Sequence, residues 1–175
     1  MSCLGKIFCT IINTRLYSWV EKHQKLSKWQ GGFRRKMGCD IQCFRLLSIA
    51  TILHQFAKPK GYNKKSQGRV FSCFVDFKKA YDSVDHLLLW KKLIKIGVSS
   101  KVLNILKQMY KNITCRVKVN GLLSQEFLYT IGVLQGCVLS PLLFILFIND
   151  VVELIQSEDV GISIGETVIF ILLYT

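Results

Sequence analysis

"FVDFKKAYDSVDH", residues 74–86, joins an apolar run to a cluster of charged residues. It opens with β-branched and aromatic residues, so "VFSCFVDF", residues 70–77, is predicted to be a buried strand that ends near Asp76. A carboxylate at a strand end, beside basic side chains, suits Mg²⁺ held between protein and phosphate oxygens. The same residue would equally serve to cap a turn or pair with a lysine, and the stretch alone leaves both readings open.

Two helices are predicted directly after this stretch. Ser83 or Asp85 is placed to cap a helix over 86–96, and Ser99 is placed to cap a second helix over 100–112. Both acids of this region, Asp82 and Asp85, are expected to serve as caps rather than as metal ligands.

A hairpin is predicted around Asn120-Gly121, because this dipeptide favours the tight turn that reverses a strand. The flanking segments "ITCRVKV", residues 113–119, and "EFLYTIGV", residues 126–133, supply the two strands.

The remaining segments complete an α+β pattern. Helical spacing of apolar residues predicts a helix over 4–26, and Pro, Gly and Asn mark 57–69 as a linker. Ser-Pro at 140–141 fits the cap and first turn of a helix over 142–156, and residues 167–174 are predicted to form a last strand. Helices and antiparallel strands in separate blocks indicate the α+β class.

The positive charge of the chain is unevenly distributed. The 175 residues carry a formal net charge of +13, and 14 of the 24 basic residues lie in residues 1–70 together with only two acids. A basic stretch of this kind is typical of a surface that binds a polyanion, and the alternative is a solvated basic face without a partner.

The seven cysteines form an odd set, and no secretory signal opens the chain. We therefore expect reduced thiols in an intracellular protein, and the cysteines do not decide between nucleus and cytoplasm. Cys39 and Cys43 have C-x3-C spacing, but no second Cys pair or His pair lies at zinc-site spacing, so buried small side chains are expected instead.

The longest apolar runs, "CVLSPLLFILFI" and "VIFILL", fall short of the roughly 18 residues that a membrane span needs. They are interpreted as core elements, and no membrane partner is expected.

Four segments in order resemble the reverse transcriptase domain of non-LTR (LINE-like) retrotransposons, and the likeness covers almost the whole chain. They are "LGKIFCTIINTRL" at 4–16, "QGGFRRKMG" at 30–38, "FVDFKKAYDSVDH" at 74–86 and "GVLQGCVLSPLLFILFIND" at 132–150. The order and spacing of all four make the resemblance specific.

The resemblance implies an RNA-directed DNA polymerase with a right-hand fold. Residues 1–69 would be a fingers-like basic region with a linker, and residues 70–175 a partial palm, an antiparallel sheet with packed helices and no thumb. The implied partners are an RNA template, an RNA/DNA duplex and deoxynucleoside triphosphates, with Mg²⁺ as cofactor.

The resemblance also assigns roles to single residues. Asp76 matches the first catalytic aspartate, and the backbone carbonyl of Phe77 would be a further metal ligand. Tyr81 matches the aromatic that would clash with a ribose 2′-OH and so select deoxynucleotides. Arg34 matches a fingers arginine that would grip triphosphate or template. Without the resemblance, Tyr81 is an ordinary core aromatic and Arg34 one more exposed basic residue.

A further group, Gln135, Gly136, Ser140 and Pro141, matches the segment that lies along nucleotide and template. Gly136 would allow close approach of the backbone, and the helix that follows would turn its N-terminus toward phosphate. A turn followed by a helix cap would use the same residues.

The chain departs from the family at Gly31, where Ala is usual, and at Val138, where Pro is usual. Members also carry a second motif, Tyr-Ala-Asp-Asp, and the sequence stops at Thr175 just after a matching Tyr174. Since two metal ions need carboxylates from both motifs, we expect the chain to be catalytically incompetent alone. A non-catalytic RNA or RNA/DNA binder and a retroelement remnant without activity are the alternatives, and the last strand, open on one side, is expected to promote self-association.

Overall fold

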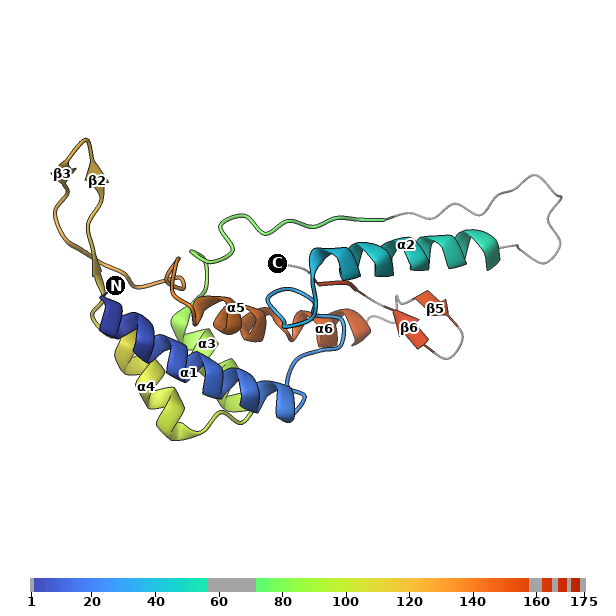
Figure 1. Cartoon of the computed structure of the whole chain (residues 1–175), viewed down its shortest axis with the longest axis horizontal. Coiled ribbons are helices and arrows are strands. Elements are labelled where there is room, and N and C mark those ends of the chain that lie inside the picture. Colours follow the sequence, from blue (N-terminus) through green and yellow to red (C-terminus); the bar gives the residue numbers. More distant parts are fainter. Residues whose placement is uncertain (1, 57–71, 158–161, 165–166, 170, 174–175) are drawn as a thin grey trace. The chain divides into compact units, whose positions relative to one another are not determined.

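The computed structural model describes residues 2–56, 72–157, 162–164, 167–169 and 171–173. The chain divides into two compact units. Figure 1 labels the helices and strands of the chain. Unit 1 comprises Met1–Leu26 and Lys78–Ile148, and unit 2 comprises Ser27–Phe77 and Asn149–Thr175. Each unit takes segments from both sides of the predicted boundary at residues 69 and 70, and the assignment of fingers and palm stays a prediction.

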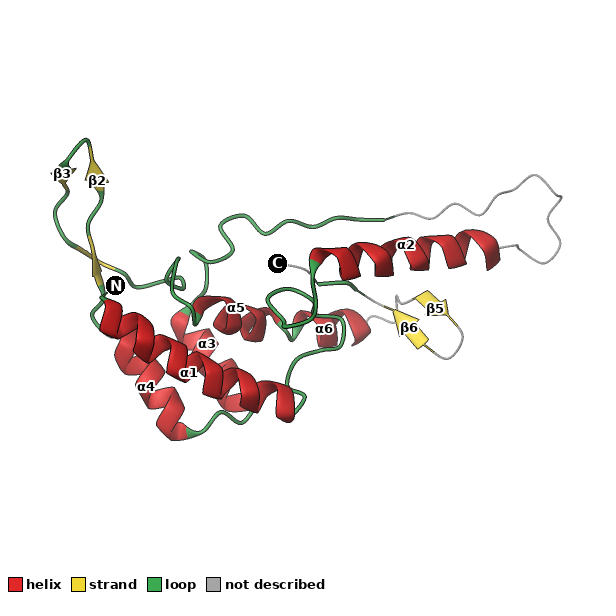
Figure 2. Ribbon diagram, viewed as in Figure 1, coloured by secondary structure: helices red, strands yellow, loops and turns green. Residues whose placement is uncertain are grey.

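Four helices make up most of unit 1 (Figure 2). They are α1 (Cys3–Lys22), α3 (His86–Lys95), α4 (Ser100–Tyr110) and α5 (Ser140–Ile148). The predicted helix over 4–26 is confirmed as α1, which ends four residues earlier than expected.

The core of unit 1 is built around α5. This helix is apolar on every side, and seven of its nine residues are buried, which is the pattern of a helix enclosed by its neighbours. Helix α3 packs against both α5 and α4. The side chains of Leu89, Leu93, Leu106, Leu143 and Ile145 are completely buried.

The predicted caps of α3 and α4 are confirmed. The Asp85 carboxylate accepts a hydrogen bond from the backbone N–H of Leu88 at 2.7 Å, so Asp85 rather than Ser83 starts α3. The Ser99 hydroxyl oxygen accepts one from Val102 at 3.4 Å at the start of α4. Each cap satisfies a backbone donor that has no partner within the helix.

The predicted turn at Asn120-Gly121 is also confirmed, with both residues at positive φ, 48° and 84°. The strands that it joins are shorter than expected, and they form two short antiparallel ladders rather than one long one. The first pairs β1 (Thr114–Cys115) with β4 (Phe127–Leu128), and the second pairs β2 (Lys118–Val119) with β3 (Leu122–Leu123).

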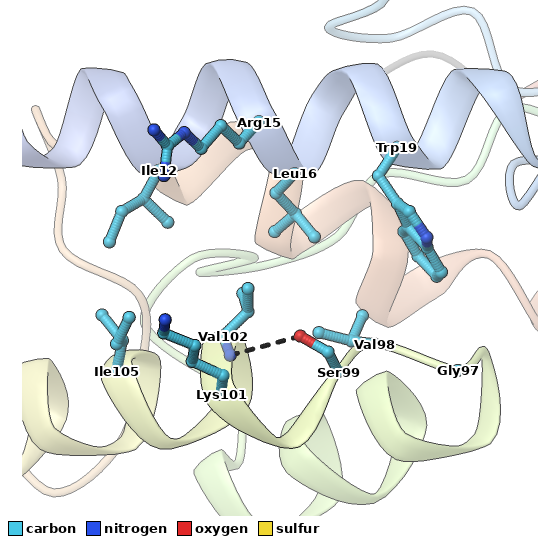
Figure 3. A pocket seen from close by; sticks show the side chains of 10 residues that line it. All are labelled: Ile12, Arg15, Leu16, Trp19, Gly97, Val98, Ser99, Lys101, Val102 and Ile105. Carbon is cyan, nitrogen blue, oxygen red and sulfur yellow. Dashed lines mark hydrogen bonds between the residues drawn. The ribbon is translucent and has the colours of Figure 1, made fainter.

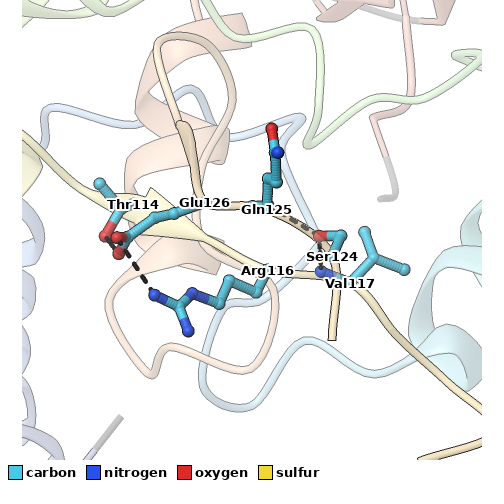
Figure 4. A network of polar contacts seen from close by, with 6 residues as sticks. All are labelled: Thr114, Arg116, Val117, Ser124, Gln125 and Glu126. Carbon is cyan, nitrogen blue, oxygen red and sulfur yellow. Dashed lines mark hydrogen bonds and ion pairs between the residues drawn. The ribbon is translucent and has the colours of Figure 1, made fainter. Parts of the chain in front are cut away.

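Polar side chains join the two ladders (Figure 4). The Thr114 hydroxyl donates to the Glu126 carboxylate, which also pairs with Arg116 at 3.5 Å. The Ser124 hydroxyl oxygen accepts a hydrogen bond from the backbone N–H of Val117 at 2.9 Å. These contacts hold the hairpin together where the ladder is interrupted.

Unit 2 contains α2 (Cys39–Phe56), α6 (Val151–Ser157) and the antiparallel pair β5 (Ile162–Ile164) and β6 (Thr167–Ile169). A parallel bridge joins Gln30 to Leu173, where Leu173 donates to Trp29 at 3.0 Å and accepts from Gly31 at 2.8 Å. The expected linker at 57–69 and Tyr174 lie outside the described residues, and self-association through the last strand stays a prediction.

The predicted buried strand over 70–77 is wrong for the residues that are described. Residues 72–77 form no strand, and Phe74 and Val75 are 80% and 77% exposed. A β-rich sequence becomes a strand only when a neighbour accepts its ladder of hydrogen bonds, and no strand of the described part of the chain pairs with it. The described strands form three separate two-stranded sheets instead of one palm sheet.

The predicted single helix over 142–156 is also wrong, because it is divided between α5 and α6 at Asn149 and Asp150. By length and composition alone, the segment Ser140–Ser157 would be long and apolar enough to cross a membrane. Buried core helices of soluble proteins meet the same criterion. Seven buried residues of α5 identify it as a core helix of unit 1, as expected for this apolar run.

The expectation of buried cysteines holds only for Cys9 and Cys137. Cys115 is half-buried, and the other four cysteines are exposed. Cys3, Cys39 and Cys43 lie on helices, and Cys73 lies in the extended segment 72–77.

A matched pair of substitutions in α3 tests the core of unit 1. Leu89→Ala should lower the free energy of unfolding by about 2–5 kcal/mol, because it leaves a cavity at a fully buried site. Leu87→Ala, two residues away and 72% exposed, should change it by less than about 0.5 kcal/mol. Urea denaturation of the two variants measures both values, and equal losses would contradict this core.

Candidate functional site

Two of the quoted segments, 74–86 and 132–150, are joined in unit 1 by backbone hydrogen bonds. The N–H of Val133 donates to the carbonyl of Tyr81 at 2.8 Å, and the N–H of Gly132 donates to the carbonyl of Val84 at 2.8 Å. These bonds connect residues that are about fifty positions apart in the sequence. The structure therefore brings Tyr81 close to the start of the segment that contains Gln135 and Gly136.

Gly132 makes this close approach sterically feasible. Its φ is +95°, and a Cβ atom there would lie 3.0 Å from both the Tyr81 carbonyl oxygen and the Asp82 Cα, and 2.5 Å from the Tyr129 hydroxyl. A side chain would therefore push the two segments apart.

Side chains reinforce the same junction. The Gln135 amide donates to the Asp82 carboxylate at 3.0 Å, so Asp82 contacts the second segment and does not cap α3 as expected. His86 Nε2 donates to the Gly132 carbonyl at 2.7 Å, and its ring packs edge-on to Tyr110 at 5.0 Å between centroids. Burial raises the pKa of Tyr110 to about 12, so it is a neutral packing partner at neutral pH.

Tyr81 itself is half-buried. Its ring centroid lies 5.1 Å from that of Phe144 in α5, and burial raises the pKa of its hydroxyl. A ring fixed by packing against a core helix has a defined position, which a steric selector requires.

Gly136 and Ser140 occupy the turn that leads into α5. Gly136 has φ +80°, and a Cβ there would meet no heavy atom within 4 Å, so the space beside this backbone is open. The Ser140 hydroxyl does not cap α5 as predicted but donates to the Leu134 carbonyl at 2.6 Å, because the serine is the buried first residue of the helix. Pro141 follows it in the first turn, as expected.

The other predicted residues belong to unit 2. One guanidinium nitrogen of Arg34 donates to the carbonyls of Ser27 at 3.1 Å and Gln30 at 3.4 Å. Asp76 and Phe77 lie in the extended, exposed segment 72–77. The structure thus brings Tyr81, Gln135 and Gly136 together within unit 1, and it places Arg34, Asp76 and Phe77 in unit 2.

A family model described as reverse transcriptase (RNA-dependent DNA polymerase) matches residues 1–174. The chain belongs to the reverse transcriptase family. One similar relative is the RNA-directed DNA polymerase from mobile element jockey of Drosophila funebris, 29% identical over 167 residues, which are 95% of this chain and 17% of the relative. Its counterpart in Drosophila melanogaster is 30% identical over 165 residues, 91% of this chain and 17% of the relative.

A third relative is the Pol polyprotein from type-1 retrotransposable element R2 of Popillia japonica, 27% identical over 175 residues, 99% of this chain. The relatives belong to non-LTR mobile elements, as the four segments predicted. The reverse transcriptase chain spans only 17–23% of the length of these three relatives.

The described part of this reverse transcriptase chain does not supply a full set of metal ligands. No group of three His, Cys, Asp or Glu side chains lies close enough together there to hold a metal ion. Asp76 offers one carboxylate and Phe77 one carbonyl oxygen, whereas a two-metal site needs carboxylates that clamp both ions. The described residues do not by themselves fit the pair of ions that the family implies.

The reverse transcriptase chain also has a cavity of about 330 Å³ between α1 and α4, away from the predicted site residues (Figure 3). Ile12, Leu16 and Trp19 line one wall, and Val102 and Ile105 line the other. None of the residues expected to act on nucleotide or template borders it.

Three residues of the junction were missed by the sequence interpretation as site residues: Asp82, His86 and Gly132. The first two stand within the quoted segment 74–86, but a carboxylate or an imidazole near a helix start is most often a cap. For Gly132, the only signal in the sequence is that it is the first residue of the segment 132–150.

Two glycine substitutions separate backbone strain from close packing at the junction. Gly121→Ala, at the open hairpin turn, should cost only the strain of a left-handed residue, about 1–2 kcal/mol. Gly132→Ala should cost distinctly more, because the added Cβ also meets the backbone of Tyr81 and Asp82. Urea denaturation of both variants gives the comparison, and a loss at Gly132 no larger than at Gly121 would argue against a tight junction.

Proposed function

We propose that the chain forms the part of an RNA-directed DNA polymerase site that receives the incoming deoxynucleotide. The observation that carries the proposal is the junction of segments 74–86 and 132–150 through the backbone of Tyr81, Val84, Gly132 and Val133. These backbone hydrogen bonds are a property of this chain's own structure and do not depend on the similarity to its relatives.

Each predicted residue has a role that fits its surroundings. Tyr81, held against Phe144, presents a flat ring to the sugar and disfavours a ribose 2′-OH. Gly136 leaves open space beside its backbone, where a nucleotide or template base approaches closely. Gln135 is oriented by its bond to Asp82. Arg34 brings a guanidinium that binds phosphate in two-point contacts.

Asp76 and the carbonyl of Phe77 are proposed to contribute ligands to Mg²⁺, which supplies charge neutralisation at the phosphates when bound. The other acids nearby already have structural contacts. Asp82 accepts from Gln135, and Asp85 caps α3. We therefore propose that polymerisation requires carboxylates beyond those of these 175 residues, and that the 175-residue chain alone is inactive.

Primer extension on an oligonucleotide-primed RNA template tests this function. The 175-residue chain is compared with a longer polymerase in which the same residues are followed by a family-like Tyr-Ala-Asp-Asp hairpin and thumb. We expect incorporation only by the longer protein. In it, Asp76→Asn should abolish incorporation, because the metal-binding charge is lost.

Asp85→Asn is the matched control for Asp76→Asn. It removes the same charge nine residues away, and asparagine caps a helix as well as aspartate does. Incorporation should therefore persist. Loss of activity in both variants, or activity of the unextended chain, would refute the assignment of Asp76.

Tyr81 gives a second test in the longer polymerase. Tyr81→Val should raise incorporation of ribonucleotides relative to deoxynucleotides, because the ring that meets the 2′-OH is removed. Tyr81→Phe keeps the ring and its packing on Phe144, so it should keep the discrimination. The ratio of the two incorporation rates measures the effect, and equal ratios in Val and Phe variants would exclude a steric gate.

Binding of RNA without catalysis is the second candidate, favoured by the 14 basic and two acidic residues in residues 1–70. Such binding depends on phosphates, so it should weaken steeply with salt and survive Asp76→Asn. Fluorescence anisotropy with a labelled RNA/DNA duplex at several salt concentrations measures it. Weak binding that does not depend on salt would contradict the RNA-binding hypothesis. It would favour a retroelement remnant without activity.

A further inference from the structure

A cavity of about 330 Å³ lies between α1 and α4, entirely within unit 1 (Figure 3). Six apolar side chains line it, at steps of four and three residues along each wall: Ile12, Leu16 and Trp19 on one, and Val98, Val102 and Ile105 on the other. Residues with this spacing share one face of a helix, so two apolar faces border the cavity from opposite sides. None of the residues proposed to meet nucleotide or metal borders it.

The size of the cavity suits a small molecule. Pockets that bind small ligands measure about 300–1,000 Å³, and this cavity lies at the lower end of that range. Its lining comes from α1 and from residues 97–105, which are the turn before α4 and the first turns of that helix. A ligand is therefore held between two helices of one compact unit rather than spread over an open surface.

Two cations border the cavity, and none of its ten lining residues is acidic. Arg15 projects from α1 and Lys101 from α4. Neither side chain makes a hydrogen bond or ion pair with the described residues. In Figure 3 the nitrogen atoms of both side chains point toward the end of the cavity that carries Ile12 and Ile105. This end of the cavity therefore attracts an anionic group.

The indole ring of Trp19 forms the opposite end of the cavity (Figure 3). The ring packs against that of His23, with 5.1 Å between centroids, and Lys25 Nζ lies 5.7 Å from its centre. These contacts give the indole a defined position. An aromatic wall of this kind packs well against the apolar body of a ligand.

We propose that this cavity binds a small organic anion whose apolar body lies between Leu16, Trp19 and Val102. Its acidic group pairs with Arg15 and Lys101. Release of water from the apolar surfaces drives the association. The two cations orient the ligand and favour it over an uncharged molecule of the same shape.

Titration of the 175-residue chain with anilinonaphthalene sulfonate, an aromatic anion that fluoresces when it leaves water, tests the site. We expect saturation at one molecule per chain. Decanoate should displace this probe at a several-fold lower concentration than decanol, which has the same chain length and no charge. Equal displacement by the two compounds would overturn the role of the cations.

Removal of both cations should weaken binding of the probe about tenfold, because each exposed ion pair contributes a few-fold in affinity. The variant is Arg15→Gln with Lys101→Gln. The matched control is Lys6→Gln with Lys107→Gln, which removes two exposed charges from the same two helices outside the cavity lining. The control should bind as tightly as the original chain. Equal weakening in both double variants would indicate nonspecific attraction to a basic chain and overturn the proposal.

Filling the cavity provides an independent test. Val102→Trp places a large side chain in it and should abolish binding of the probe. Full binding by this variant, with its helices intact by circular dichroism, would assign the probe to exposed apolar side chains elsewhere and overturn the proposal. The two charge variants, at exposed positions, decide the question if Val102→Trp fails to fold. No measurement uses polymerase activity, so the cavity and the proposed function succeed or fail separately.

Discussion

The close approach of two backbone segments at Gly132 is the constraint on which the rest of unit 1 depends. Its missing side chain lets the segment bond directly to the carbonyl groups of Tyr81 and Val84. With these bonds formed, the imidazole of His86 reaches the Gly132 carbonyl and the Gln135 amide reaches Asp82. The positions of Tyr81 and Gln135 relative to each other therefore depend on this glycine.

Interactions within a few residues were predicted well from the sequence. The caps at Asp85 and Ser99 and the turn at Asn120-Gly121 each depend on one side chain and the backbone next to it. The junction was not predicted in this way, because no periodicity connects Asp82 to Gln135 fifty-three residues later. The resemblance identified both segments as important, but it gave no sign that an amide and a carboxylate would bond between them.

The wrong predictions share a tertiary cause. Residues 72–77 have the composition of a strand, but they remain exposed because no described strand pairs with them. The helix over 142–156 is continuous by hydrophobicity, yet it stops at Asn149, whose side-chain carbonyl accepts a hydrogen bond from the backbone N–H of Ser27 at 2.8 Å. The end of α5 thus coincides with a contact to a residue 122 positions away, which composition does not reveal.

Three acids among the described residues make contacts that hold the fold. Asp82 bonds to Gln135, Asp85 caps α3, and Glu126 joins the strands of the hairpin. Asp76 is exposed, and it makes no hydrogen bond or ion pair with the described residues. An exposed carboxylate at the position that matches the first catalytic aspartate of the family agrees with the metal-binding role proposed for it. Exposure alone does not distinguish Asp76, because Asp40 is also exposed. The proposed metal-binding role of Asp76 rests on its match to the first catalytic aspartate of the family.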